Sequence, residues 1–167
     1  MTALVLATAL TLQDGFPPTL LHWPQELVEA VASVGYEAGP LSLWQDEDAW
    51  LHAQGCVIWT AVNRLRSDSF PDDETVADEY YAAWNADGEF IPPTDQQLEL
   101  ALQVLGMDAA DDPTKGALFA MSAMDVRWLQ WPDGDGVLRA ADGVHAIHFY
   151  GRWLGLPDCW GHCGEEL

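Results

Sequence analysis

The sequence contains one long segment of helical periodicity, EDAWLHAQGCVIWTAVNRLR at residues 47–66. Its apolar side chains recur at helical spacing and comprise Trp50, Ala53, Val57, Ile58, Ala61 and Leu65. Asp46 or Asp48 is placed to cap the N-terminus through a side-chain oxygen. Because no other helical segment of the chain is as apolar, we expect these residues to form the central helix of the fold.

Helical patterns also occur before and after this segment. Apolar residues recur on one face of residues 27–38, which a Gly-Pro pair ends. A capping box formed by Thr94 and Gln97 opens another helix, which runs to Leu105. A shorter helix is predicted over residues 74–84. The first two thirds of the chain are therefore expected to be mainly helical.

The pattern changes toward the C-terminus. Residues 117–121 and 144–150 are typical of short strands, and a turn at residues 132–136 lies between them. Helices followed by a small sheet indicate an α+β fold. With 167 residues, 49% of them hydrophobic, the chain is large enough for one domain with a single core.

The net charge restricts the possible partners. The chain has 6 basic and 27 acidic residues, for a formal charge of −21. This charge repels nucleic-acid phosphates and anionic lipids, so we expect neither nucleic acid nor a membrane as a partner. The acidity either keeps the protein solvated or mimics DNA phosphates toward a basic protein partner. The acidic residues are scattered along the sequence, which favours solvation.

The three cysteines do not form a disulfide framework. Cys56 lies in an apolar helical segment and is expected to be buried. Cys159 and Cys163 flank His162, so they could form a local disulfide or half of a metal site. No second Cys/His pair stands at zinc-ligand spacing, and His145 and His148 should point to opposite faces of a strand. We therefore favour a reduced pair and expect no metal and no cofactor.

Four short segments occur in a distinctive order. They are GYEA at residues 35–38, AVNRLRSDSFP at 61–71, DPTKGALF at 112–119 and HAIHFY at 145–150. Their order and spacing resemble the cell-wall hydrolase family typified by the spore cortex-lytic enzymes, which are lysozyme-like lytic transglycosylases of peptidoglycan. The resemblance covers about residues 26–153.

The resemblance implies a fold, a substrate and a division of the chain. The fold would be lysozyme-like, mainly helical with a small antiparallel sheet near the C-terminus. The substrate would be peptidoglycan glycan strands, cleaved between N-acetylmuramic acid and N-acetylglucosamine to leave a 1,6-anhydro product. The hydrolase domain would span residues 26–156, between an N-terminal packing segment at 1–25 and a C-terminal tail at 157–167.

The family's catalytic glutamate aligns with Glu37. A carboxylic acid donates a proton near neutrality only where poor solvation raises its pKa, and Glu37 ends an otherwise apolar helix. The alternative is a solvated glutamate at a helix end. About eight residues are inserted between Glu37 and Asn63 relative to the family, so Glu47 is a second candidate for the acid, and Glu47 or Asp48 could replace the family's second acidic residue.

Other residues of these segments have expected roles in binding or architecture. The aromatic candidates for contact with a sugar, each of which could instead belong to the core, are Tyr36, Trp44, Tyr81, Trp84 and Tyr150. The resemblance implies structural roles for Asn63, Arg64, Asp112 and Pro113.

The location is also an expectation from the sequence. Residues 1–12 are apolar but lack a basic region and are too short to span a bilayer, so we expect no standard signal peptide. A phage lysis or virion enzyme fits this pattern, as it would remain in the cytoplasm until release to the cell wall or travel with the virion. The alternative function is a catalytically decayed family member that acts as an acidic binding module, including a mimic of nucleic acid.

Overall fold

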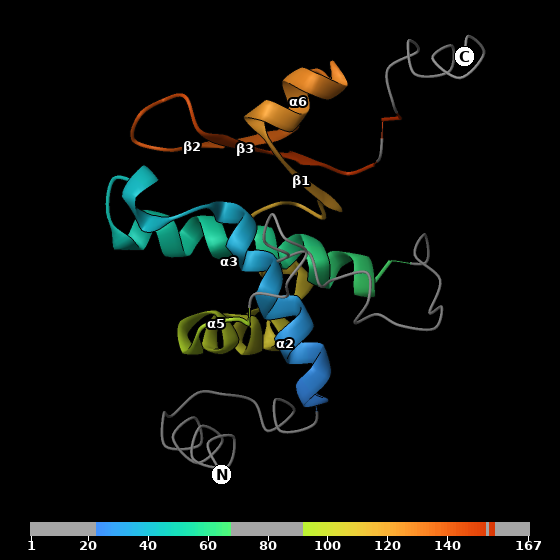
Figure 1. Cartoon of the computed structure of the whole chain (residues 1–167). Helices are drawn as coiled ribbons and strands as arrows, with labels where there is room; N and C mark the ends of the chain where they lie inside the picture. The colour runs from blue at the N-terminus through green and yellow to red at the C-terminus, as the bar shows by residue number, and fades with distance from the viewer. Residues whose placement is uncertain (1–22, 68–91, 153, 156–167) are drawn as a thin grey trace, which may run out of the picture.

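The computed structural model describes residues 23–67, 92–152, 154 and 155, and combines helices with a small antiparallel sheet (Figure 1). The predicted α+β class is therefore confirmed. The predicted helix at residues 74–84, the pair Cys159 and Cys163, and most of the two terminal segments lie outside the described residues. No helix in the described ranges is long and apolar enough to cross a membrane.

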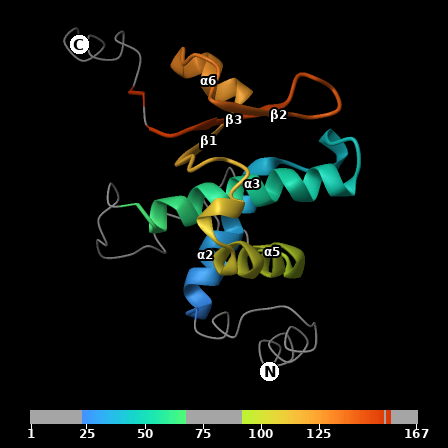
Figure 2. The same ribbon diagram turned by 180° about the vertical axis from the view of Figure 1, so that it is seen from behind.

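The predicted central helix is present as α3, Glu47–Leu65. It begins as expected, because the Asp46 side chain accepts a hydrogen bond from the backbone N–H of Ala49 at 2.7 Å. Residues on more than one face of α3 are buried, including Trp59 and Val62, which lay outside the predicted apolar face. The extra burial arises because helices and the sheet all pack against α3, as Figures 1 and 2 show.

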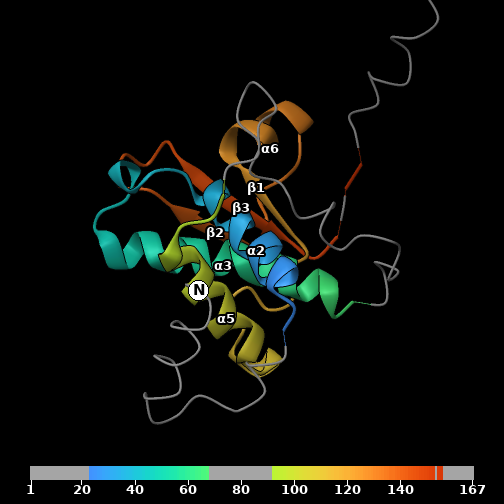
Figure 3. The same ribbon diagram turned by 60° about the horizontal axis from the view of Figure 1, so that its bottom comes forward.

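The helix before α3 differs from the prediction at its C-terminus. Helix α2 spans Gln25–Val34, and the chain then tightens into a 3-10 turn, η2, at Gly35–Ala38. At Gly35 a Cβ atom would stand 3.3 Å from the Ile58 side chain and 3.4 Å from that of Gln54, so a glycine permits the close approach of this turn to α3. A second 3-10 turn, η3, follows at Leu41–Leu43. Figure 3 shows the C-terminal end of α2 directed toward the sheet.

Helix α5, Asp95–Gly106, packs against both α2 and α3. The predicted capping box is present: the Thr94 hydroxyl accepts from the Gln97 backbone N–H, and the Gln97 side chain accepts from the Thr94 backbone N–H at 2.9 Å. Gln97 is buried at the junction with η2, where a Cβ on Gly35 would stand 3.5 Å from its Nε2 atom. A short 3-10 turn, η4, follows at Ala109–Asp111.

The sheet has three antiparallel strands in the order β1-β3-β2. Strands β1, Phe119–Ser122, and β3, Ala146–Tyr150, occupy the predicted segments. Helix α6, Ala123–Leu129, and strand β2, Gly136–Arg139, were not predicted. They were missed because each is short, and β2 gains its hydrogen bonds only from pairing with β3.

Both faces of the sheet are covered, and Figure 1 shows α3 and α6 on opposite sides of it. Ile147 and Phe149 of β3 pack into the core formed with α3, whereas Tyr150 packs with Val126 and Leu129 of α6. All five residues of β3 are therefore buried, including His148. His145 directly precedes the strand, so of the two histidines expected on this strand only His148 lies within it.

One cluster of hydrogen bonds joins the helices to the sheet. The Asn63 amide of α3 donates to the Asp112 carboxylate at 2.8 Å and to the Ala117 carbonyl at 3.0 Å. Asp112 also accepts from the backbone N–H groups of Thr114 at 2.7 Å and Gly116 at 2.6 Å. The turn that leads into β1 is thus wound around the Asp112 carboxylate and attached to α3 through Asn63.

We expect Asn63→Ala to lower the free energy of unfolding by about 2 kcal/mol, because the substitution removes one of the donors to Asp112 and the Asn63 donor to the buried Ala117 carbonyl. Urea denaturation followed by circular dichroism measures the change. Glu99→Gln, an exposed substitution on α5, is the control and should change the free energy by less than about 0.5 kcal/mol. An effect of Asn63→Ala no larger than the control would contradict the structural role of Asn63.

The Asp112 cluster also has a pH dependence. Burial acts to raise the pKa of Asp112, but hydrogen bonds from Thr114, Asn63 and Gly116 outweigh it, and the net pKa is lowered. A carboxyl with a lowered folded-state pKa stabilises the fold above its unfolded pKa, which is about 3.9, and loses that contribution as the pH falls through the folded value. Asp112→Asn should therefore destabilise the protein at pH 7 and have progressively less effect below about pH 4. A destabilisation independent of pH would contradict this linkage.

Candidate functional site

The backbone directly after Glu37 is held by three aromatic side chains. The Ala38 carbonyl accepts a hydrogen bond from the Trp44 indole N–H at 2.9 Å, and His145 Nε2 stands 3.3 Å from the same oxygen. The Gly39 carbonyl accepts from the Trp50 indole N–H at 2.9 Å. The carbonyls at the end of a helix have no partner within the helix, so these contacts stabilise the turn that carries Glu37.

Trp44 belongs to the core in this arrangement. Its side chain is buried, and its ring meets that of His145 edge to face, with centroids 5.9 Å apart. Since its N–H is already bonded to the Ala38 carbonyl, the geometry favours the core interpretation of Trp44 over stacking on a sugar. Trp44, in the segment between η2 and α3, therefore helps to hold the Glu37 turn in place.

Gly39 permits the change of direction after η2. Its φ of +76° lies in a region that L-residues with a side chain rarely adopt. A Cβ atom there would also stand 3.2 Å from the Leu43 side chain and 3.4 Å from His145 Nε2. The glycine therefore allows η3 and His145 to approach the carbonyl end of η2.

The electrostatic surroundings of Glu37 raise its pKa to about 7. Burial by the surrounding protein is the largest cause, because it disfavours the charged form. The guanidinium of Arg64 acts in the opposite direction, while the carboxylate of Asp125 raises the pKa further. A substantial fraction of Glu37 is therefore protonated at neutral pH, as a general acid requires.

The Glu37 side chain is nevertheless exposed to solvent. The two observations describe different properties. Accessible surface records whether a solvent molecule can touch the side chain, whereas the pKa depends on how much poorly polarisable protein lies around the carboxyl. A carboxyl that is open to solvent on one side and has protein on its other sides shows both.

Arg64 is held in place by the first residues of the sheet. Its Nε donates to the Leu118 carbonyl, and its guanidinium carbon lies 4.7 Å from the centroid of the Phe119 ring. The cation is thus engaged with β1 while its charge still acts on Glu37. Because burial outweighs Arg64, the cation moderates the pKa of Glu37 without restoring its ordinary value.

Glu47 occupies a different place. It is the first residue of α3, exposed, and its carboxylate lies 3.4 Å from Nε2 of Gln96. Arg64 lies near the other end of the same helix, about 26 Å away along the axis at 1.5 Å per residue. Glu47 therefore faces α5 at the surface, and the geometry favours Glu37 as the acid.

The remaining aromatic candidates for contact with a sugar differ in their exposure to solvent. Tyr36 is 51% exposed beside Glu37 and is available to a ligand. Tyr150 is buried: its hydroxyl donates to the Pro132 carbonyl at 2.8 Å, and burial is the main cause that raises its pKa. The structure thus places Tyr150 in the core with Trp131. Tyr81 and Trp84 lie outside the described residues.

The residues that were expected to have structural roles lie where α3 meets the turn that leads into β1. Asn63 and Asp112 are bonded directly, Pro113 follows Asp112 in the turn, and Arg64 is attached to β1. These contacts agree with the architectural roles expected for them.

Sequence reasoning did not identify Asp125. It lies in the first turn of α6, where its backbone N–H donates to the Ser122 hydroxyl at 3.2 Å and its carboxylate accepts from that hydroxyl at 2.6 Å. The pattern Ser122-x-x-Asp125 is a helix-start signal and could have predicted α6. No local pattern indicates that Asp125 acts electrostatically on Glu37, because the two residues are far apart in the sequence.

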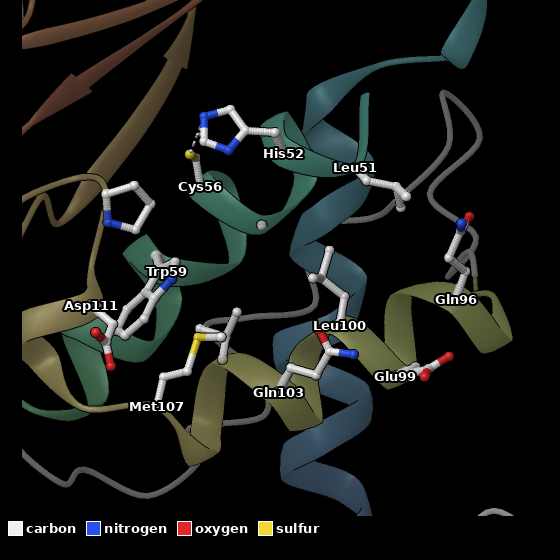
Figure 4. A pocket seen from close by; sticks show the side chains of 13 residues that line it. Leu51, His52, Cys56, Trp59, Gln96, Glu99, Leu100, Gln103, Met107 and Asp111 are labelled. Atoms are coloured by element: carbon white, nitrogen blue, oxygen red, sulfur yellow. Dashed lines mark hydrogen bonds between the residues drawn. The ribbon is translucent and has the colours of Figure 1, made fainter. Parts of the chain in front are cut away.

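Two cavities lie against the face of α3 that points away from η2. One, of about 540 Å³, lies between α3 and α5 and is shown in Figure 4. The other, of about 490 Å³, lies between α3 and the sheet. Both are lined by His52 and Cys56, which are turned away from the α3 side chains that meet η2. Glu37 lines neither cavity, so neither belongs to its site.

The chemistry of these cavities is limited. His52 Nε2 lies 3.7 Å from the Cys56 sulfur (Figure 4), but burial, with a smaller effect of Asp112, raises the pKa of the Cys56 thiol to about 12. A thiol with so high a pKa is not a nucleophile at neutral pH. Within the described ranges, no group of three or more His, Cys, Asp or Glu side chains could hold a metal ion.

No protein-family model, curated protein or solved structure matches this chain. The interpretation of the site therefore depends on the geometry around Glu37 and on the order of the sequence segments.

We expect the Glu37 carboxyl to titrate near pH 7 in a ¹³C NMR experiment on the folded protein. A carboxyl whose folded-state pKa is raised favours the fold below its unfolded pKa of about 4.3 and loses that contribution as the pH rises through the folded value. Glu37→Gln should therefore be more stable than the wild type at pH 8 and nearly equal to it at pH 4. Glu47→Gln is the control, and its stability relative to the wild type should not change between pH 4 and pH 8 in this way. Titration of Glu37 near its ordinary pKa would contradict the expectation.

Proposed function

We propose that this chain is a peptidoglycan hydrolase that cleaves glycan strands between N-acetylmuramic acid and N-acetylglucosamine by lytic transglycosylation, with Glu37 as acid and base. The observation that carries the proposal is that Glu37 remains accessible while its pKa is raised to about 7. An accessible carboxylic acid that is protonated near neutrality can deliver a proton to a large substrate.

The arrangement of the four sequence segments supports the same function. The first and fourth meet where His145 contacts the Ala38 carbonyl at 3.3 Å. The second and third meet in the hydrogen bond from Asn63 to Asp112. The third and fourth meet where the Leu118 N–H donates to the Tyr150 carbonyl at 2.8 Å. Segments far apart in sequence thus meet in the fold, as expected if the chain shares a lysozyme-like arrangement with the family that it resembles.

The first chemical step requires the protonated form of Glu37. Its carboxyl donates a proton to the glycosidic oxygen, the bond from that oxygen to C1 of N-acetylmuramic acid breaks, and positive charge develops on C1 and the ring oxygen. The N-acetylglucosamine part leaves with a free hydroxyl. The raised pKa of Glu37 keeps the acid form populated where an ordinary glutamate would be ionised.

The second step uses the carboxylate that remains. It accepts the proton of the C6 hydroxyl of the same N-acetylmuramic acid while the C6 oxygen bonds to C1, which closes a 1,6-anhydro ring. Glu37 then has its proton again and no water has been consumed. One carboxyl with a pKa near the working pH can serve as acid and then as base.

Tyr36 is the aromatic side chain best placed to contact the sugar. It precedes Glu37 in η2 and is half exposed, whereas Trp44 and Tyr150 are buried. A tyrosine ring can pack against a sugar ring while its hydroxyl stays in water.

We expect Glu37→Gln to lower the rate of glycan cleavage by about 10² to 10⁴-fold, because the amide keeps the shape of the side chain but has no acidic proton. Purified glycan strands are digested with wild type, Glu37→Gln and the control Glu47→Gln, and the products are identified by mass spectrometry. Wild type and the control should release products that end in 1,6-anhydro-N-acetylmuramic acid.

Two outcomes would contradict the proposed function. A folded Glu37→Gln protein with wild-type turnover would remove Glu37 from the mechanism. A wild type that yields no glycan product, and instead binds a basic protein partner in a strongly salt-dependent way, would favour an acidic binding module.

A further inference from the structure

Residues 131–135 lead from α6 to β2 and are called the crossover below. We propose that His148 of β3 and Asp133 of the crossover form an acid-sensitive contact, which releases the crossover from β3 when His148 becomes protonated. The device belongs to the fold and is independent of the proposed hydrolysis.

The crossover is held along β3 by three contacts. The Trp131 ring meets the Tyr150 ring edge to face, with centroids 5.0 Å apart. The Tyr150 hydroxyl donates to the Pro132 carbonyl at 2.8 Å, and the Asp135 backbone N–H donates to the Phe149 carbonyl at 3.0 Å. Both ends of the crossover are therefore fixed against the strand.

His148 lies on the face of β3 that α6 covers (Figure 1). Side chains two residues apart on a strand share a face, and Tyr150 packs with Val126 and Leu129 of α6. The His148 side chain is only 6% exposed, and its Nδ1 atom stands 3.6 Å from Oδ1 of Asp133. Among the residues that the structure describes, Nδ1 has no hydrogen-bond partner.

Protonation of His148 changes what Nδ1 requires. A neutral imidazole carries one N–H, whereas the imidazolium carries an N–H on both ring nitrogens. A buried charge, and a buried donor without an acceptor, are both unfavourable. The distance of 3.6 Å to Asp133 exceeds the usual length of a hydrogen bond. The observed geometry therefore suits the neutral form of His148 and not the charged form.

The crossover cannot move closer to β3 to shorten this distance. At Gly134 a Cβ atom would stand 2.3 Å from the Phe149 carbonyl oxygen, so the two backbones are already in close contact. The Asp133 side chain is 76% exposed, so water screens its attraction for the imidazolium. Protonation should therefore move the crossover outward, where water can reach the charged ring.

The charges around His148 agree with this direction. Burial is the main cause that lowers the pKa of His148; Asp133 acts to raise it, and Arg139 of β2 lowers it further. Strand β1 has no titratable residue. The other titratable residues of the elements around His148 are Asp135 of the crossover, Asp125 and Arg127 of α6, and Tyr150 of β3.

The sign of the pH dependence follows from the lowered pKa. When the crossover is open, His148 is solvated and should titrate near the ordinary value of about 6.5. A histidine whose pKa is lowered in the closed form stabilises that form above the open-form pKa. This contribution is lost as the pH falls below about 6.5 toward the closed-form value.

A ¹H NMR titration of the His148 ring tests the electrostatic part. Wild-type His148 should titrate below about 6.5. Asp133→Asn should lower its pKa further, and Arg139→Gln should raise it. The control is Asp135→Asn, an exposed carboxylate of the same crossover, which should leave the titration close to that of the wild type. A wild-type His148 that titrates above about 6.5 would show that Asp133 closes on the imidazolium, and would overturn the inference.

Hydrogen exchange tests the release of the crossover. The protection of the Asp135 N–H should fall between about pH 7 and about pH 5, by roughly tenfold for each unit that separates the open-form and closed-form pKa values. The Leu118 N–H, which donates to the Tyr150 carbonyl, is the reference and should keep its protection. The fall at Asp135 should be larger in Asp133→Asn, smaller in Arg139→Gln and absent in His148→Phe.

Three outcomes would overturn the inference. The first is an equal loss of protection at Asp135 in the wild type and in His148→Phe. The second is an unchanged pH dependence in both Asp133→Asn and Arg139→Gln, which retain the histidine and serve if His148→Phe does not fold. The third is an equal loss at Asp135 and Leu118, which would mean that the sheet opens as a whole. None of these measurements uses a glycan, so the proposed function is tested separately.

Discussion

The hydrogen bond from Asn63 to Asp112 joins the helical part of the molecule to the sheet. Asn63 is in the last turns of α3, and the turn that it holds leads directly into β1. The neighbouring residue, Arg64, donates to the carbonyl of Leu118, which directly precedes the same strand. Because β1 in turn pairs with β3, this connection fixes the sheet on α3 together with the packing of Ile147 and Phe149 in the core.

The site near Glu37 is built on that connection. Helix α3 supports η2 from one side, through Trp50 and the close approach at Gly35. The sheet supports it from the other side, through His145. A carboxyl between two supports can be surrounded by protein and still be reached from outside. This combination raises the pKa of Glu37 to about 7 without enclosing it.

The strong acidity of the chain is compatible with this chemistry. A formal charge of −21 produces a negative field, which disfavours the ionisation of further carboxyl groups. The field alone would act on all the acidic residues, but Asp112 departs in the opposite direction because its hydrogen bonds outweigh the burial of its carboxyl. Local burial therefore decides the direction of the pKa shift at Glu37, and local hydrogen bonds decide it at Asp112.

Local signals in the sequence were sufficient to determine α3, α5 and two of the strands. Helical periodicity and the caps at Asp46 and Thr94 depend only on residues a few positions apart, so they can be read before the fold is known. Glu37 was predicted to be the catalytic acid in a different way, from a resemblance in its short segment and in the order of the segments that follow. The absence of matches to known proteins leaves its catalytic role to experiment.

Only the tertiary structure decided what surrounds these elements. Strand β2 exists because β3 offers it a partner, and Trp44 belongs to the core because its indole meets the Ala38 carbonyl. The electrostatic effect of Asp125 on Glu37 likewise joins residues that are far apart in the sequence. Sequence spacing carries no record of such contacts, because packing and burial depend on residues that are distant in the chain. The sequence by itself therefore determined where the acid stands, and the tertiary structure decided its pKa and its neighbours.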